Sequence, residues 1–181
     1  RRNTHQILDS AAELLATDPL ASLDRVAAHA HVSRTTLYHH FPGRDALLDA
    51  LTDRSVSEVC SALQSARPTE GTAIEAMQRV LKSAWQVVGR YRGLLSINPR
   101  RLGRDELRRR LGPAVQPIRA LVIRGQRSRE FDTTLPPDWL VGLLIDMIHA
   151  AGAQVSEGTM DTTTAEQALL RSATAVLTSC R

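Results

Sequence analysis

The sequence predicts an all-α fold, with a three-helix domain of helix-turn-helix type at the N-terminus and a longer helical domain after it, about nine helices in all. Apolar residues recur every three to four positions along most of the chain, which is the period of an amphipathic helix. No segment shows the alternation of apolar and polar residues that is typical of a half-buried strand. A hydrophobic fraction of 43% in 181 residues is enough for a core, and the length allows one or two small domains.

Serine residues predict where the second and third helices begin. The first helix is expected over residues 4–16. After a loop, Ser22 can cap a second helix and Ser33 a third, because a serine hydroxyl accepts hydrogen bonds from backbone amides of the first turn. A tight turn over residues 30–32 separates the two. Two short helices joined by about three residues form a helix-turn-helix motif, whose second helix enters the major groove of DNA.

The third helix is expected to turn a polar face outward. Leu37 and Phe41 are four residues apart and fall on one buried stripe. Arginine can form a fork onto guanine, and threonine and tyrosine hydroxyls can hold phosphates, so the opposite face suits a DNA groove. An ordinary amphipathic helix with a solvated face is the competing interpretation. The outward residues are Arg34, Thr35, Thr36, Tyr38 and His39.

Residues 7–51 resemble the DNA-binding domain of the TetR (tetracycline repressor) family. The resemblance implies a helix-turn-helix DNA-binding domain over residues 1–50 and a helical effector-binding and dimerisation domain over residues 51–181. The family usually has glycine where this chain has His31, and because histidine tolerates a positive φ better than most residues, we predict φ > 0 there. The matching segments are Ile7-Leu8-Asp9-Ser10-Ala11-Ala12-Glu13-Leu14-Leu15, Val26-Ala27, Val32-Ser33-Arg34-Thr35-Thr36-Leu37-Tyr38-His39-His40-Phe41 and Arg44-Asp45-Ala46-Leu47-Leu48.

Polar residues in and around the motif are the candidates for contact with DNA. Arg34 and Thr35 are our leading candidates for base readout, and the resemblance implies that the hydroxyl and imidazole groups after them hold phosphates. Arg44 opens the fourth helix, where exposed amides favour an anion. His40 either packs against the protein or contacts phosphate. The candidate DNA-binding residues are Ser22, Arg25, Ser33, Arg34, Thr35, Thr36, Tyr38, His39, His40 and Arg44.

Six more helices are expected after the motif. Asn98-Pro99 is expected to stop a short helix, and Gly112-Pro113 to bend or restart the next one, because proline lacks the amide that continues a helix. Pro137 suits the first turn of the following helix. The expected ranges are 44–66, 72–89, a short helix within 93–103, 104–126, a helix that begins at Pro137, and a ninth capped by residues 162–164.

The resemblance implies a small-molecule pocket enclosed by the fifth to eighth helices. Ordinary core packing is the competing interpretation for each candidate residue. Asp146 and His149 stand out because polar groups in an apolar helix need partners, which a ligand or a second subunit could supply. Aromatic residues make up only 3% of the chain, which favours a modest, partly aliphatic ligand. The candidates are Met77, Trp85, Tyr91, Ile118, Val122, Trp139, Asp146, Met147 and His149, with Val88, Leu95 and Val115 beside them.

The last two helices, within residues 137–179, are more apolar than a monomer needs. We expect a homodimer interface there, with completion of the core as the alternative. Because a twofold dimer presents two recognition helices to one face of DNA, the expected DNA partner is a palindromic operator. The expected function is that of a repressor modulated by a small-molecule effector; the alternative is a helix-turn-helix protein regulated by a protein partner.

Several classes of function are not expected. The sequence has no G-x-S-x-G, H-E-x-x-H, Walker or dinucleotide glycine pattern, so we expect no enzyme. Cys60 and Cys180 are too few for a zinc site or a disulfide framework; we expect no metal, no cofactor and a cytoplasmic location. The longest apolar run, residues 139–153, is interrupted by Asp146 and His149, so we expect it to be too short and too polar to span a bilayer.

The net charge of +4 does not arise in the candidate DNA-binding domain. Residues 100–110 hold six arginines against two carboxylates, which equals the whole excess, whereas residues 1–50 hold five arginines and six carboxylates. Strong non-specific affinity for DNA is therefore not expected. The arginines of residues 100–110 either form a solvated face or attract an acidic effector. No secretory signal is visible at the start, and because the sequence begins with Arg1 rather than Met, residues before it could add a basic arm.

Overall fold

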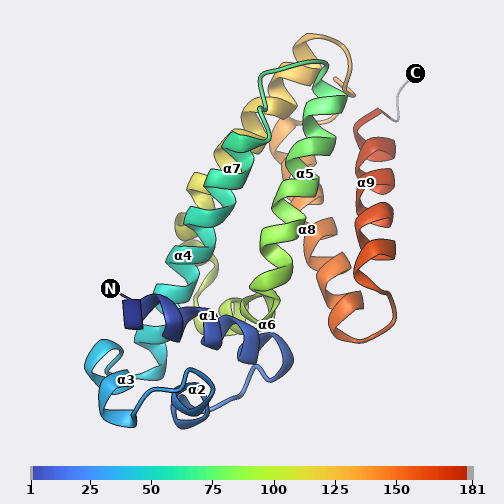
Figure 1. Cartoon of the computed structure of the whole chain (residues 1–181). Helices are drawn as coiled ribbons and strands as arrows, with labels where there is room; N and C mark the ends of the chain where they lie inside the picture. Colours follow the sequence, from blue (N-terminus) through green and yellow to red (C-terminus); the bar gives the residue numbers. More distant parts are fainter. Residues whose placement is uncertain (1, 179–181) are drawn as a thin grey trace.

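The computed structural model describes residues 2–178, and over this range the chain forms nine α-helices and no strand (Figure 1). The all-α prediction is therefore confirmed. The helices are α1 (Arg2–Thr17), α2 (Leu23–His29), α3 (Arg34–His40), α4 (Arg44–Ser65), α5 (Ala73–Arg90), α6 (Arg92–Arg101), α7 (Arg104–Arg127), α8 (Pro137–Ser156) and α9 (Thr162–Thr178).

Three details of the predicted helices are wrong. Pro99 does not stop α6, which continues to Arg101 and ends where the Leu102 amide donates to the Asn98 carbonyl at 2.8 Å. Likewise α7 does not restart at Gly112-Pro113 and is one helix through Pro113 and Pro117; the alternative of a bend there stays a prediction. Each proline removes a single backbone hydrogen bond, and the packing of α7 against α4, α5 and α8 outweighs that loss. The cap of α9 is Asp161, whose carboxylate accepts from the Thr164 amide at 2.8 Å, rather than a threonine.

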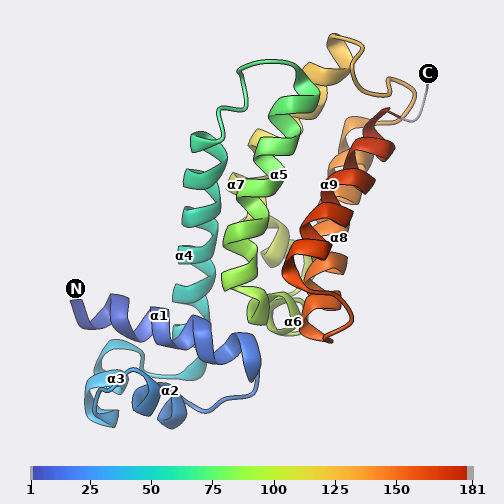
Figure 2. The ribbon, with the colours of Figure 1, turned by 45° about the vertical axis from the view of Figure 1, so that its right-hand side comes forward.

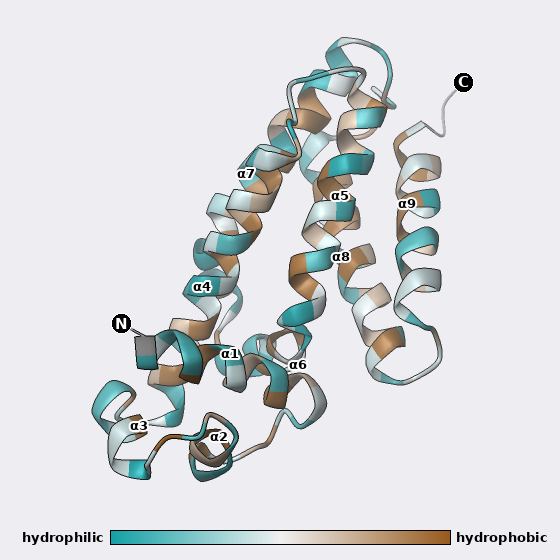
Figure 3. Cartoon of the chain, viewed as in Figure 1, coloured by the Kyte–Doolittle hydropathy of each residue, from teal (hydrophilic) through white to brown (hydrophobic). Residues whose placement is uncertain are grey.

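The chain has two hydrophobic cores, one at each end of the long helix α4. The first, which we call the head core, joins α1, α2, α3 and the first turns of α4 with Tyr91 and Leu94 from the α5–α6 junction. The second, the body core, joins the rest of α4 with α5, α7, α8 and α9. Figure 2 shows the head at one end of α4 and the α4–α5 loop at the other. Hydrophobic and hydrophilic residues form stripes along the body helices (Figure 3).

Helix α4 passes without a break through residues 50 and 51, the expected boundary between the two domains. The head is also held to the body by α6, which packs against α1. Gly93 makes this close approach possible, because a Cβ at that position would overlap the backbone carbonyl of Leu15. The division into residues 1–50 and 51–181 stays a proposal about function, and the two parts share one continuous helix.

Helix α8 is longer than the apolar run that predicted it. It begins at Pro137 and continues to Ser156, and among the described residues it is the one helix long and apolar enough to cross a membrane by length and composition alone. The expectation that this segment is too short and too polar is therefore wrong. Its inner side chains, such as Leu140 and Leu144, lie in the body core, yet only 28% of the stretch is buried.

Candidate DNA-binding face and ligand cavity

Helices α2 and α3 form the predicted helix-turn-helix, and both serine caps are confirmed. The Ser22 hydroxyl accepts from the Arg25 amide at 3.3 Å, and the Ser33 hydroxyl accepts from the Thr36 amide at 3.0 Å. His31 lies in the turn between them with φ = 53°, so the prediction of a positive φ is also confirmed. These local bonds fix where α2 and α3 begin.

The polar face of α3 is uncovered, as predicted. Leu37 is fully buried in the head core, while Tyr38 on the opposite side is 47% exposed. A tyrosine that points into solvent has an apolar ring with no cover and a hydroxyl free to bind, which is typical of a recognition surface. The other exposed residues of this face are Ser33, Arg34, Thr35 and His39, and Thr36 and His40 are half-buried.

Carboxylates of the head hold the arginines of this face. The guanidinium of Arg34 lies 3.0 Å from the carboxylate of Asp24, and Arg25 forms an ion pair with Asp18. Both arginine side chains are more than half exposed, and exposed pairs of this kind contribute little to stability. Phosphate or a base edge could therefore replace the carboxylates at small cost.

Two other candidate residues have partners within the head. Arg44 donates to the backbone carbonyls of Pro19, at 2.6 Å, and Ala21, so its guanidinium fixes the loop between α1 and α2. The Nδ1 atom of His40 lies 3.3 Å from the hydroxyl of Thr4 on α1. Both contacts are structural, and a role in DNA binding for either residue stays a prediction.

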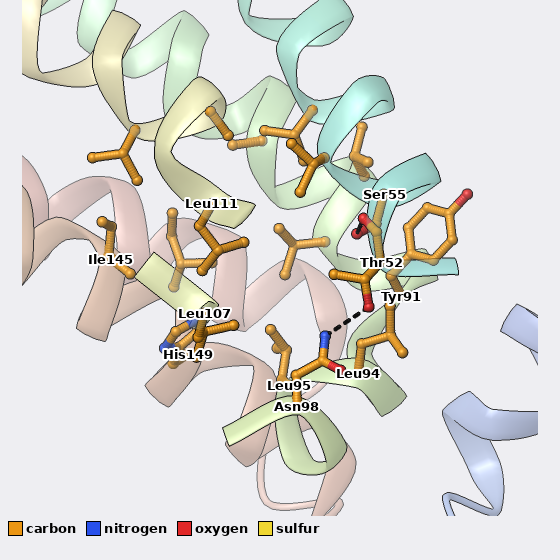
Figure 4. Close-up of a pocket in the computed structure, with 18 of the residues that line it drawn as sticks. Thr52, Ser55, Tyr91, Leu94, Leu95, Asn98, Leu107, Leu111, Ile145 and His149 are labelled. Atoms are coloured by element: carbon orange, nitrogen blue, oxygen red, sulfur yellow. Dashed lines mark hydrogen bonds between the residues drawn. The ribbon is translucent and has the colours of Figure 1, made fainter. Parts of the chain in front are cut away.

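A cavity of about 140 Å³ opens within the body between α4, α5, α6, α7 and α8 (Figure 4). Fifteen of its twenty lining residues are aliphatic. Of the nine predicted ligand-binding residues, Tyr91, Ile118 and His149 line it. The three neighbours named with them also do so: Val88, Leu95 and Val115.

The other six predicted ligand-binding residues lie outside this cavity. Met77, Val122 and Trp85 are buried in the body core. Trp139 and Asp146 are exposed on α8, and Met147 is half-buried against the core. Helical periodicity identified the inward faces of α5, α7 and α8, but it cannot tell a position facing a cavity from one facing another helix. The lining residues that were missed come from α4, α6 and the start of α7, among them Thr52, Ser55, Asn98, Leu107 and Leu111.

Polar side chains on the cavity wall bond mainly to one another or to the backbone. The Asn98 amide donates to the Thr52 hydroxyl at 3.0 Å, which in turn donates to the Leu48 carbonyl at 2.7 Å. The Tyr91 hydroxyl donates to the Glu58 carboxylate at 2.8 Å. Burial, and then this carboxylate, raise the pKa of Tyr91 to about 12. A polar residue such as Thr52 among apolar neighbours is the signal that could have identified this part of the wall.

His149 of α8 is the histidine among the described residues that line the cavity, and Figure 4 shows it with Leu107 and Ile145 on the wall. Burial lowers the pKa of its imidazole, and the charge of Asp146 offsets part of that effect. The ring is therefore neutral near pH 7, with one nitrogen able to donate a hydrogen bond and the other able to accept one.

Two chains of polar contacts connect the cavity wall with the head. In the first, Arg101 bridges the Asn98 side chain at 3.3 Å and the Asp49 carboxylate at 2.8 Å. Arg110 lies 2.8 Å from the same carboxylate. Partial burial tends to raise the pKa of Asp49, but the bonds and charges of these two arginines hold it below its ordinary value.

The second chain begins at Tyr91. Its partner Glu58 accepts from Arg54 at 2.9 Å, and Arg54 reaches Asp9 of α1 at 2.5 Å and the His5 carbonyl at 3.3 Å. A change in the position of Tyr91 at the cavity wall can therefore alter the contacts of α1, which shares the head core with α2 and α3.

Comparisons with known proteins agree with this geometry. Residues 7–51 match the model of the bacterial regulatory proteins of the tetR family. The chain is 40% identical over 83 residues to the transcriptional repressor LfrR of Mycolicibacterium smegmatis, a stretch that spans 45% of this chain and 43% of LfrR. It is 44% identical over 61 residues to the transcriptional regulator EthR of Mycobacterium tuberculosis, across 33% of this chain and 28% of EthR. The chain thus matches less than half the length of these curated relatives.

Solved structures resemble the chain over nearly its whole length. The structure of LfrR in complex with proflavine superposes with a TM-score of 0.80 at 27% identity and covers 98% of this chain and 97% of that one. The fatty acid degradation regulator FadR from Bacillus halodurans has the same fold, with a TM-score of 0.78 at 14% identity over 96% of this chain and 95% of FadR.

Proposed function

Because the chain belongs to the TetR family of bacterial regulatory proteins, we propose that it is a cytoplasmic, sequence-specific transcriptional repressor and not an enzyme. Its operator binding responds to a small molecule held in the cavity of the body. The observation that carries the proposal is the uncovered face of α3, where an arginine, threonines and a tyrosine point outward from a helix anchored by Leu37. Such a face fits the major groove.

On DNA, Arg34 and Thr35 read base edges, and the remaining polar groups of the motif hold phosphates. As α3 enters the groove, the guanidinium of Arg34 leaves the carboxylate of Asp24 and binds guanine. The exchange costs little free energy because the Arg34 side chain is exposed. The head has no excess of positive charge, so affinity depends on these few contacts rather than on a general attraction to phosphate.

The chain acts as a homodimer through residues 137–179, of which the structure describes 137–178. Its support is an apolar stripe on α8 that the body core does not cover: Trp139 is 59% exposed, and Leu143, one turn on, is half-buried. An exposed apolar stripe on a long helix is typical of an interface. Two heads related by a twofold axis then read a palindromic operator.

The effector acts from within the cavity. LfrR was solved with proflavine bound, which supports a small-molecule effector in this chain too. Occupation of the cavity displaces the Asn98 and Tyr91 contacts that lead to Asp49 and to α1, and so changes the orientation of the head. Couplings of about 1–3 kcal/mol are typical of such linkage.

A specific observation keeps a second candidate function open, in which a protein partner regulates the same DNA-binding head. The cavity has a volume of about 140 Å³, which is smaller than the roughly 300–1,000 Å³ that is usual for ligand sites. A regulator whose body is filled by its own side chains would need no small molecule.

Selection of bound sequences from a random DNA pool tests the proposal directly. The expected result is a palindrome whose half-sites match two copies of α3. Arg34→Ala should lower operator affinity by about 1–3 kcal/mol and relax one position of each half-site, whereas Arg108→Ala on α7, which removes an exposed charge outside the head, should do neither. Recovery of no preferred sequence, or equal effects of both variants, would overturn the assignment.

A further inference from the structure

We infer that the effector is a small, neutral, mainly aliphatic molecule with one hydrogen-bonding group, which His149 receives. This inference rests on the proposed function, since it names the class of ligand that the cavity of the body takes. Four observations carry it: the aliphatic wall, its lack of charge, the His149 ring without a described hydrogen bond, and the size of the cavity.

The wall is almost wholly aliphatic. Valine, leucine, isoleucine, alanine and proline supply fifteen of the twenty lining residues, and they come from every helix around the cavity. Leu107 and Leu111 close it from α7, and Ile145 closes it from α8 (Figure 4). Such a surface gains most from a ligand that removes apolar area from water. Tyr91 contributes its ring, but its hydroxyl is already bonded to Glu58.

No described lining residue carries a carboxylate, an ammonium or a guanidinium group. Arg101, which contacts Asn98 of the wall, and Arg110 are engaged with Asp49, which does not line the cavity. A charged ligand would lose its hydration and find no opposite charge, which strongly disfavours binding. The wall therefore selects against cations and anions alike.

The wall offers one polar group that the protein leaves without a described hydrogen bond. Thr52 and Asn98 bond to each other, and Ser55 donates to the Thr52 carbonyl at 2.8 Å. No hydrogen bond of the His149 ring is found among the described residues, and His149 is one of the side chains that line the cavity (Figure 4). A hydroxyl or carbonyl on the ligand can pair with this neutral imidazole.

The size of the cavity sets the size of the ligand. At about 140 Å³ it is close to the engineered apolar cavity of about 150 Å³ that stays dry and binds benzene. A molecule of about six carbons is therefore large enough to fill this cavity.

Three ligands of equal length test the inference on the unaltered protein: hexan-1-ol, hexan-1-amine and hexanoate, which near pH ~7.5 are neutral, cationic and anionic. Methyl resonances of Leu107, Leu111 and Ile145 report occupancy of the cavity and yield each Kd. Hexan-1-ol should bind at least about tenfold more tightly than either charged analogue. Equal or tighter binding of a charged analogue at these methyls, or no response to any of the three, would overturn the inference.

Two variants locate the selectivity. Leu111→Glu places a carboxylate in the wall and should reverse the order, so that hexan-1-amine binds more tightly than hexan-1-ol. Gln116→Glu adds the same charge at an exposed position of α7 outside the cavity and should leave the order unchanged. His149→Leu should weaken hexan-1-ol about three- to tenfold, as loss of one hydrogen bond implies, and leave toluene binding unchanged; loss of both ligands to the same extent contradicts the role of His149.

Failure of the inference can be told apart from failure of the proposed function by measuring operator affinity in the same titrations. If hexan-1-ol binds the cavity and operator affinity stays constant, the ligand class stands and the proposed effector response is wrong. If operator affinity changes only with a charged analogue, the response stands and the ligand class is wrong. The series on the unaltered protein does not depend on the folding of any variant.

Discussion

Single arginine side chains near the polar face of α3 form exposed ion pairs with carboxylates, and DNA could replace those carboxylates. Arg34 contacts Asp24 from the neighbouring helix; the arginine side chain is largely exposed and the aspartate is half-buried. A carboxylate beside a base-reading arginine has two effects: it orients the guanidinium in the free protein, and it repels the phosphates that approach it. The second effect persists in the complex, so the pair restrains affinity.

The variant Asp24→Asn should therefore bind its operator more tightly. Loss of an exposed ion pair is worth about 0.2–1 kcal/mol, so the gain in operator affinity that we expect is at most about fivefold. Fluorescence anisotropy with an operator duplex at two salt concentrations measures it, and the gain should shrink at higher salt. Asp53→Asn, an exposed carboxylate on α4 outside the motif, is the matched control. Weaker binding by Asp24→Asn would mean that the carboxylate serves to place Arg34.

His149 makes stability depend on pH in a definite direction. Burial lowers the pKa of this imidazole in the folded protein, with partial compensation from Asp146, whereas in the unfolded chain it titrates near about 6.5. Between the two values the unfolded state binds more protons, so stability falls as pH decreases below about 6.5. Urea unfolding at pH ~7.5 and ~5.5 should show a smaller loss for His149→Leu than for the parent. An equal loss in both proteins would show that the ring is not desolvated.

Two helices connect the body with the head. Helix α6 contacts α1 where Gly93 lies against the backbone of Leu15, and α4 runs through both cores. Under the proposed function, we expect these helices to carry a small displacement at the cavity wall to α3. The two series of polar contacts, one through Asp49 and one through Glu58, link these helices to each other.

Tyr91→Phe tests the second of those chains without changing the shape of the cavity. It removes the hydroxyl that donates to Glu58 while keeping the ring, and Glu58 retains Arg54 and Arg90 as partners. Unfolding free energy should fall by about 1 kcal/mol, and the effect of hexan-1-ol on operator affinity should decrease. Tyr38→Phe, on the exposed face of α3, should leave stability unchanged. An undiminished ligand effect in Tyr91→Phe would exclude this route.

For the molecule as a whole, the proposed homodimer requires that a second copy cover the outer stripe of α8. That helix is apolar enough to pass for a membrane span by composition, and most of it is not buried within the chain. A second subunit would bury Trp139 and the residues one and two turns after it, which removes an exposed apolar surface from water.

Leu143→Glu should convert a dimer into a monomer. The side chain is half-buried on the outer stripe of α8, where a carboxylate has no partner and two copies repel each other. Light scattering measures the mass, and operator affinity should fall with it because each half-site then binds alone. Gln116→Glu on α7 provides the charge-matched control. A parent protein that is monomeric at micromolar concentration, or a Leu143→Glu variant that stays dimeric, would contradict the interface.

The reading head could be predicted from its residues because its signals are local. Ser22 and Ser33 cap helices within one turn of themselves, His31 occupies the turn, and Leu37 with Phe41 marks the buried stripe, so neighbours in sequence suffice to place Arg34 and Tyr38 outward. The cavity could not be predicted in the same way. Its wall joins Thr52, Asn98 and His149, which lie on three helices far apart along the chain.

The periodicity of apolar residues predicts which face of a helix is buried. It does not predict which buried positions pack against another helix and which line a cavity, because that depends on how five helices pack together. That is why Met77 and Val122 lie in the core while Leu107 and Leu111 line the cavity. Prolines show the same limit, since Gly112-Pro113 predicts a bend or a restart and yet lies within one continuous α7 that packs against its neighbours. Local chemistry sets where helices start and which side is polar; long-range packing sets where they meet, and with it the site.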